Sequence, residues 1–306
     1  MLDIPVLFII YNRLREARKV FQAISESKPA KLYIAADGPV KDDEEDAERC
    51  NKVRGLVSSI DWKCEVYEDF SDHNLGFKNR IITALDWIFS REEEAIILED
   101  DCLPNTDFFQ YCSALLEEYK EDERIMLISG NNPLGKWKDD KLSYFFSYQG
   151  EIWGWATWKR AWEKYDVRMK EWNNERTKKI IKDRINNEGF YNIRKKTFDN
   201  IVRGIINAWD YQWFFARLLH DGLSIVPSVN LVSNIGFSGQ ATHTDDPSDN
   251  RAYARTYRLK LPLKGPDTVE DDTDFAEERY LQLMGRRKKS ILLKIKEIAD
   301  RVAGRK

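Results

Sequence analysis

Apolar runs of strand length alternate with amphipathic stretches of helix length over the first 130 residues of the chain. The continuous apolar run at 4–10 is typical of a strand buried on both faces, and the apolar positions from Ala17 to Ile24 have the period of a helix. This alternation predicts an α/β fold with a largely parallel sheet. The other elements that it predicts are strands at 32–36, 64–67 and 95–98 and helices through 53–57 and 81–89.

The alternation becomes irregular after about residue 130, and seven of the ten tryptophans lie within residues 153–213. Trp155, Trp158 and Trp162 have helical spacing. We expect most of these rings in the core, because buried aromatic residues outnumber binding ones. Aromatic faces also stack on sugars, so one or two of the rings are candidates for a glycan site.

The amino-acid composition is that of a globular protein, and the net charge argues against one kind of partner, nucleic acid. The chain has 306 residues, of which 42% are hydrophobic and 33% charged, and a net charge of -3, which argues against a general nucleic-acid binder. It contains no run of 18 apolar residues and starts directly with a strand pattern, so we expect residence in the cytoplasm. The spacing of the four cysteines fits no zinc site.

Three consecutive carboxylates, Glu99, Asp100 and Asp101, follow the apolar run at 95–98. Adjacent anions at the end of a buried strand repel one another unless a cation or donor groups offset them. A divalent metal that holds a phosphate-bearing ligand explains the pattern, and a solvated loop start explains it equally. Asp37 also follows a predicted strand, and ligands of such sheets bind where strand carboxyl ends open into loops.

Two further segments carry candidate chemistry. Asp210 stands among large aromatic residues, where partial desolvation makes a carboxylate a better proton acceptor, but it also suits the cap of a helix through Phe214 and Leu218. The segment 236–244 has two glycines beside His243, a composition that suits a loop over phosphates with an imidazole ligand. A surface histidine is the alternative for His243.

Together these motifs resemble nucleotide-sugar glycosyltransferases of the GT-A fold, in particular N-acetylglucosaminyltransferase I and its bacterial relatives. The resemblance spans about residues 3–244 in the same order. It rests on Asn12-Arg13, Asp37-Gly38, the segment 73–89, Glu99-Asp100-Asp101 with Pro104 and Asp107-Phe108-Phe109, Ser129 to Asn132, Trp153-Gly154-Trp155, Trp209-Asp210 and 225–236.

The resemblance implies a GT-A (Rossmann-like) mixed, mostly parallel sheet flanked by helices, with an acceptor-side subregion and a C-terminal helical tail. It divides the chain into a nucleotide-sugar-binding half at 1–130, an acceptor-binding and catalytic half of the same domain at 131–245, and a C-terminal extension at 246–306. It also implies a UDP-sugar donor and Mn2+, or Mg2+, for which hard carboxylate oxygens are suitable ligands.

The same resemblance implies roles for individual residues. Asp210 looks like the catalytic base, and Asp101 looks like the direct metal ligand. His243 is similar to a late histidine that completes the metal shell in many GT-A enzymes, although N-acetylglucosaminyltransferase I does not depend on one. Residues expected to face the donor are Glu99 and Asp100 at the ribose or sugar, Asp37 at the uracil, Arg13 at the diphosphate, and His73, Lys78 and Arg80 nearby.

The implied reaction is a single in-line displacement with inversion, from a UDP-sugar to a hydroxyl of a glycan or glycolipid acceptor in bacterial surface polysaccharide synthesis. A retaining GT-A enzyme, a sugar-nucleotide pyrophosphorylase and a non-catalytic carbohydrate-binding protein are the alternatives. The pyrophosphorylase is disfavoured because Tyr11 to Arg15 occupies the place of its glycine-rich loop.

The last segment, 286–306, has the pattern of a basic amphipathic helix, with nine Lys or Arg against Glu297 and Asp300. Such a helix lies on an anionic membrane surface, which would place the enzyme peripherally on the inner face of the cytoplasmic membrane, or it packs on the catalytic domain or a second subunit, or frays.

Overall fold

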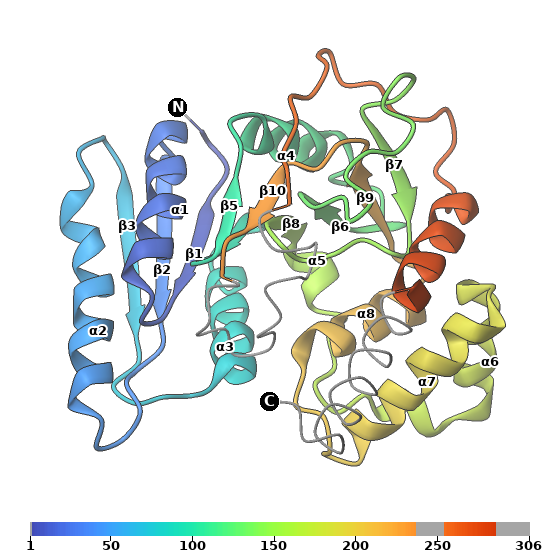
Figure 1. Ribbon diagram of the computed structural model, residues 1–306, viewed down its shortest axis with the longest axis horizontal. Coiled ribbons are helices and arrows are strands. Elements are labelled where there is room, and N and C mark those ends of the chain that lie inside the picture. The colour runs from blue at the N-terminus through green and yellow to red at the C-terminus, as the bar shows by residue number, and fades with distance from the viewer. Residues whose placement is uncertain (1, 237–253, 286–306) are drawn as a thin grey trace, which may run out of the picture.

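The computed structural model of the protein describes residues 2–236 and 254–285. Its centre is one eight-stranded sheet flanked by helices (Figure 1). Six of the strands run in one direction, and β7 and β8 run against them. The predicted fold class, α/β with a mixed, mostly parallel sheet flanked by helices, is thus confirmed. The strand order is β3 (Glu65–Phe70), β2 (Lys31–Ala36), β1 (Val6–Ile10), β4 (Glu94–Glu99), β8 (Trp155–Trp158), β6 (Ile125–Ser129), β9 (Leu223–Pro227) and β7 (Tyr144–Ser147).

The β1 strand organises the first half of the sheet. All five of its residues are buried, and it pairs in parallel with β2 on one side and β4 on the other. In this register Val6 stands beside both Leu32 and Ile96. The carboxyl ends of the three strands therefore meet at one edge of the sheet, where Asp37 follows β2, Glu99 ends β4, and Asp100 and Asp101 follow it.

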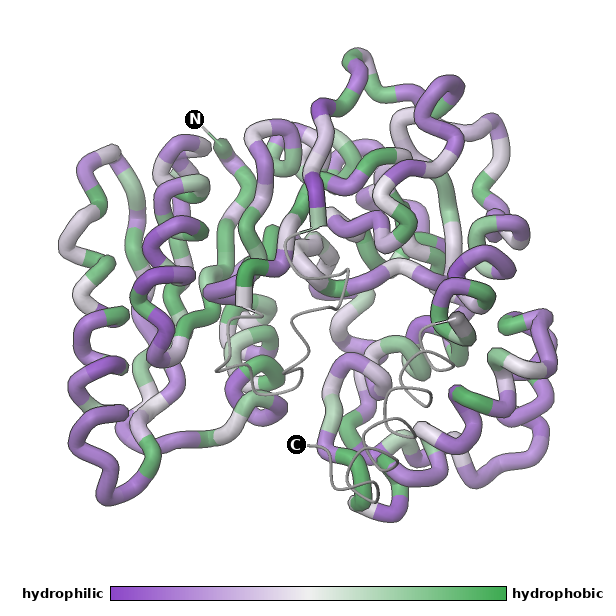
Figure 2. The backbone as a smooth tube through the Cα atoms, in the orientation of Figure 1, coloured by the Kyte–Doolittle hydropathy of each residue, from purple (hydrophilic) through white to green (hydrophobic). Residues whose placement is uncertain are grey.

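Two apolar cores cover the two faces of the sheet, and a third joins the remaining helices. Figure 2 shows that the hydrophobic residues gather along the central strands, while the outer helices are largely hydrophilic. One core holds α1 (Leu14–Ser27), α2 (Glu44–Arg54) and α4 (Asp107–Glu118), and the other holds α3 (Phe77–Phe89), α5 (Lys159–Trp162) and α8 (Trp209–Leu219). The third contains residues of η2 (Lys170–Asn173), α6 (Glu175–Ile185), α7 (Glu188–Val202) and α8. The short η1 (Gly55–Ser59) follows α2 and is not part of this third core.

The helical interpretation of the tryptophan-rich segment is wrong for most of its length. Trp155–Trp158 is strand β8, which pairs antiparallel with β4 and β6, and only the four residues of α5 are helical. The rings of Trp155 and Trp158 enter different cores on opposite faces of the sheet. A strand buried on both faces has no polar positions to mark a period of two, so the spacing of its large side chains misleads.

Two smaller features complete the fold. A ribbon of β5 (Cys102–Pro104) and β10 (Val232–Asn234) continues directly from the acidic triplet. The segment 254–272 crosses the end of the sheet to a helix at 273–285, whose Phe275 packs on Phe145 and Trp137. Strands from both predicted halves share one sheet, and the domain boundaries themselves stay a prediction.

In the described part of the chain, no helix is long and apolar enough to cross a membrane. The predicted basic helix at 286–306 lies outside the described residues.

We predict that Asn230→Ala lowers the free energy of unfolding by about 3 kcal/mol, because its buried partners would lose their hydrogen bonds. Its Oδ1 accepts from Asn132 N at 3.0 Å and Asn131 Nδ2 at 3.1 Å, and its amide donates to the carbonyls of Val232 and Arg255. Urea unfolding measures the loss. The exposed Asn51→Ala should change it by less than about 0.5 kcal/mol, and equal losses would contradict the assignment.

Candidate active site

Arg13 joins the carboxyl ends of β1 and β4. It precedes α1, and its guanidinium lies 2.5 Å from Asp100 Oδ1 and 3.0 Å from Asp101 Oδ2. The backbone N–H of Tyr11 also donates to Asp100, at 3.3 Å. One arginine thus offsets two of the three adjacent carboxylates, and the structure brings together Arg13, Asp100 and Asp101 as predicted candidates. Asp101 is the more exposed acid, with 15% of its side chain accessible against 5% for Asp100.

The triplet remains rich in negative charge. Burial raises the pKa of Asp100 to about 6, although the attraction of Arg13 opposes the rise. Burial and then the charges of Asp101 and Asp100 raise the pKa of Glu99 well above its usual range. A smaller contribution to Glu99 comes from Asp210, so this fourth carboxylate lies within electrostatic reach of the triplet. Such a site attracts cations and donors.

The chain packs closely on Asp101 at a glycine, Gly236. The backbone N–H of Ile235 donates to Asp101 O at 2.8 Å, which holds the end of β10 over the acid. A Cβ on Gly236 would stand 2.3 Å from Asp101 Oδ2 and 2.7 Å from the guanidinium of Arg13. Gly236, which packs on Asp101, is also the first residue of the segment 236–244 that is predicted to cover phosphates. Residues 237–253, including His243, lie outside the described residues.

The residues at Asp101 fit a divalent cation of the Mg2+ or Mn2+ type. Among the described residues, no group of three or more His, Cys, Asp and Glu side chains is placed to hold a metal by itself. These two ions are usually bound by one or two carboxylates together with substrate phosphates and water, so an all-protein cage is not needed. Asp101 offers the carboxylate, and Gly236 is the residue whose backbone packs against its Oδ2.

Asp37 is a buried anchor for the loop before α3. Its Oδ1 accepts from the N–H groups of Gly38 and Leu75, both at 2.8 Å, and its Oδ2 accepts from Gly76 at 3.1 Å. A Cβ on Gly38 would lie 2.4 Å from the backbone of His73, so the two segments pack backbone to backbone. These described contacts leave one lone pair of Oδ2 for a further donor. A contact of Asp37 with a uracil stays a prediction.

The three other basic candidates differ in their surroundings. His73 is exposed, and its carbonyl accepts from Ser71 Oγ at 2.7 Å. Lys78 is half-buried on α3, and burial lowers its pKa. Arg80 is buried and its guanidinium pairs with Asp69 of β3, which makes it a link between α3 and the sheet. Their contact with a donor remains untested.

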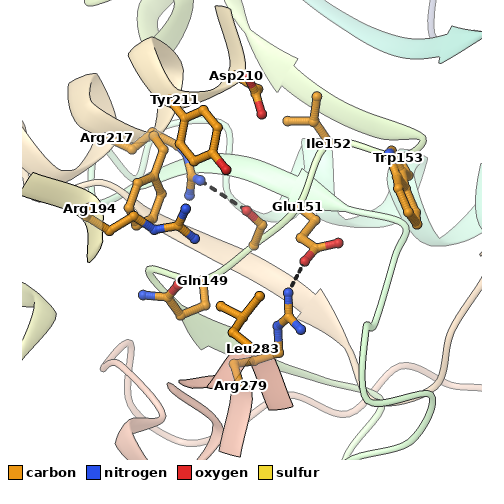
Figure 3. A pocket seen from close by; sticks show the side chains of 12 residues that line it. Gln149, Glu151, Ile152, Trp153, Arg194, Asp210, Tyr211, Arg217, Arg279 and Leu283 are labelled. Atoms are coloured by element: carbon orange, nitrogen blue, oxygen red, sulfur yellow. Dashed lines mark hydrogen bonds and ion pairs between the residues drawn. The ribbon is translucent and has the colours of Figure 1, made fainter. Parts of the chain in front are cut away.

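Asp210 lines a cavity of about 230 Å³. It is in the first turn of α8, where the helix dipole favours a carboxylate, and Ala208 rather than Asp210 takes the cap position. Figure 3 shows it beside Ile152, pointing into the cavity. The walls are the connection 149–153, α7, α8 and the helix at 273–285.

Trp153 gives this cavity an aromatic wall, whereas Trp155, Trp158, Trp162, Trp172, Trp209 and Trp213 are buried in the cores. The turn after Trp153 depends on Gly154, which has φ of +59° and whose Cβ would stand 2.8 Å from Val232. Its carbonyl accepts from the N–H of Gly130 at 2.7 Å. Core packing therefore accounts for most of the tryptophans, and Trp153 is the one that lines the cavity together with Asp210.

The cavity also contains residues that the sequence interpretation missed: Glu151, Arg194, Arg217 and Arg279. They come from four distant positions in the chain, so no local motif announces them. One signal was present. Arg194 lies four residues after Phe190 and four before Phe198, which places a charge on the apolar face of α7.

No family model and no curated protein matches the sequence. Among solved structures, the chain is similar to a mannosyltransferase, PcManGT from Pyrobaculum calidifontis, in complex with GDP-Man and Mn2+, at 12% identity and a TM-score of 0.34 over 50% of this chain and 44% of that one. It is also similar to HddC from Yersinia pseudotuberculosis, at 12% identity and 0.27 over 40% and 57%. In both cases the match spans less than two thirds of the other protein. A third structure, 4-diphosphocytidyl-2C-methyl-D-erythritol synthase from Anaerococcus prevotii, has 8% identity and 0.36 over 74% and 89%.

We predict that Asp37→Ala lowers the free energy of unfolding by about 3 kcal/mol, because three backbone N–H groups lose their acceptor. Asp37→Asn should lower the free energy of unfolding by less than Asp37→Ala, because asparagine keeps one oxygen as an acceptor. Its amide nitrogen faces a backbone N–H group, so part of the loss remains. Urea unfolding measures both, with the exposed Asp3→Ala as the matched control. A loss for Asp37→Ala no larger than that of the control would refute the anchoring role.

Proposed function

We propose that the protein is a metal-dependent glycosyltransferase that moves a sugar from a UDP-sugar to a hydroxyl of a glycan or glycolipid acceptor, with inversion. The observation that supports this most is the position of Asp210. Its charge acts on Glu99 of the acidic triplet and also on Arg194 of the cavity. A single carboxylate is therefore within electrostatic reach of both a site suited to a cation and diphosphate and a cavity suited to an acceptor.

The donor half of the proposal rests on Arg13, Asp101 and Gly236. Arg13 is pre-ordered by two carboxylates and carries a planar fork that matches phosphate oxygens. A divalent cation bound at Asp101 would offset the negative charge that develops on the departing diphosphate. Gly236 lets the backbone pass directly against Asp101 and Arg13. Glu99 and Asp100 would accept hydrogen bonds from the ribose or the sugar.

The acceptor half rests on Asp210 and the aromatic wall. A sugar ring stacked on Trp153 would bring a hydroxyl toward the carboxylate of Asp210. Asp210 then accepts the proton of that hydroxyl as its oxygen attacks the anomeric carbon of the donor. The acceptor oxygen attacks the anomeric carbon from the side opposite the departing diphosphate. The product therefore has inverted configuration.

We predict that Asp101→Ala abolishes Mn2+-dependent binding of UDP, because the carboxylate that holds the cation is lost. Calorimetric titration of UDP with and without Mn2+ measures the effect. We expect at least a tenfold loss of affinity, which corresponds to about 1.4 kcal/mol. Unchanged affinity in the presence of Mn2+ would remove the metal assignment.

A glycine pair controls for general damage. Gly236→Ala places a methyl group against Asp101 without removing a charge and should weaken the same binding, whereas Gly55→Ala meets no atom within 4 Å and should leave it unchanged. Equal effects of the two substitutions would show that the packing of Gly236 on Asp101 has no role in Mn2+-dependent binding of UDP.

We predict that Asp210→Asn lowers the rate of sugar transfer by about 10²- to 10⁴-fold, the usual contribution of a general base, while UDP binding stays normal. A UDP-sugar screen that follows Mn2+-dependent donor hydrolysis or thermal stabilisation identifies the donor first and needs no acceptor. A variant that transfers sugar at nearly the normal rate would exclude Asp210 as the base.

The alternatives give different products in the same assays. A retaining enzyme yields the opposite anomer by NMR, and a pyrophosphorylase consumes a nucleoside triphosphate with a sugar phosphate. A carbohydrate-binding protein gives no turnover. A role in bacterial surface polysaccharide synthesis, in the cytoplasm or at the inner face of its membrane, belongs to the proposal.

A further inference from the structure

The cavity beside Asp210 carries an excess of positive charge. Three guanidinium groups, from Arg194, Arg217 and Arg279, face two carboxylates, from Glu151 and Asp210. Figure 3 shows Arg194 and Arg279 directed into the space that Asp210 also faces. Arginines from α7, α8 and the helix at 273–285 are thus brought to one small volume.

Two of these arginines already have partners. Arg217 is only 2% exposed and donates to the carbonyls of Tyr148 and Gly150 and to Ser224 Oγ. Arg279 is paired with Glu151 and donates to Gln282. Both groups therefore hold the walls of the cavity together and contribute charge to it.

Arg194 is placed differently. Its guanidinium carbon lies 4.6 Å from the ring centre of Phe190, 5.0 Å from that of Phe214 and 5.1 Å from that of Tyr211. Three aromatic rings thus fix the position of the charged group. Within residues 2–236 and 254–285 it forms no ion pair and its Nε has no hydrogen-bond partner, so the hydroxyl of Tyr211 and the more distant charge of Asp210 are the groups that favour its charge.

This arrangement is costly without a ligand. Burial lowers the pKa of Arg194, and burial together with the charge of Arg194 lowers that of Arg217 to about 9. Buried charges are stable when they are paired and hydrogen-bonded, and a guanidinium pairs best with a carboxylate or a phosphate. An anion in the cavity would offset the repulsion among the three arginines.

We propose that the acceptor carries an anionic group, a phosphate or a carboxylate, which binds to Arg194 beside Asp210. The anion would sit against the guanidinium while the sugar ring that bears the reacting hydroxyl lies toward Trp153. Naming this ligand the acceptor rests on the proposed function, whereas the anion site itself rests on the arginines.

Ligand-observed NMR titration tests the site with three probes: glucose 6-phosphate, glucuronate and glucose, each with and without saturating UDP and Mn2+. We expect at least one charged probe to bind the full-length protein more tightly than neutral glucose. Tighter binding of the phosphate identifies a phosphorylated acceptor, and tighter binding of glucuronate identifies a uronic acid. Arg194→Gln should weaken binding of the charged probe at least tenfold, since charge-assisted hydrogen bonds are lost. Arg194→Lys should recover part of it.

Two matched variants separate this site from others. Arg203→Gln removes an exposed arginine at the end of the same helix, and Arg176→Gln removes an exposed arginine on α6, so both should bind the charged probe normally. Thermal unfolding of Arg194→Gln checks that the fold is retained.

Equal binding of glucose and the charged probes, or unchanged binding by a folded Arg194→Gln, overturns the inference. A different result would count against the proposed function and not against the anion site. In that case the unmodified protein binds the charged probe in the titration without UDP but does not bind UDP itself.

Discussion

The ion cluster of Arg13 with Asp100 and Asp101 is the constraint on which the site depends. Parallel pairing of β1 with β4 brings the chain after each strand to the same edge of the sheet, and the negative charges that follow β4 would repel one another there. Arg13 follows β1 and offsets them from the neighbouring strand. The cluster therefore fixes the start of α1 and keeps the acids in place.

Charge is distributed unevenly across the molecule around this cluster. The edge that follows β4 is acidic and depends on one arginine, while the cavity between α7, α8 and the helix at 273–285 is rich in arginine. Each region is suited to ligands of the opposite charge to its own, and they adjoin at Asp210. Two substrates of a transfer reaction need such separate surfaces with one shared boundary.

The sequence was sufficient for features that are encoded locally. A continuous apolar run followed by acids placed β4 and the triplet, and the acidic and aromatic pattern around Asp210 placed the start of α8. It was insufficient where periodicity is lost, as in β8, and where a site is assembled from distant positions. Arg194 and Arg279 meet only because α7 and the helix at 273–285 pack on the same wall, which no spacing within either segment indicates.

Asp210 experiences both regions at once. Its charge disfavours ionisation of Glu99 and favours the charged form of Arg194. A cation and diphosphate on one side, or an anionic group on the other, would each act on this same carboxylate, because charges in a partly buried site are poorly screened by solvent and salt. The carboxylate proposed to take the proton thus stands within electrostatic reach of both surfaces. This position follows from the fold, since Trp209 at the start of α8 stacks on Trp155 of β8, which pairs with Ile97 near the end of β4.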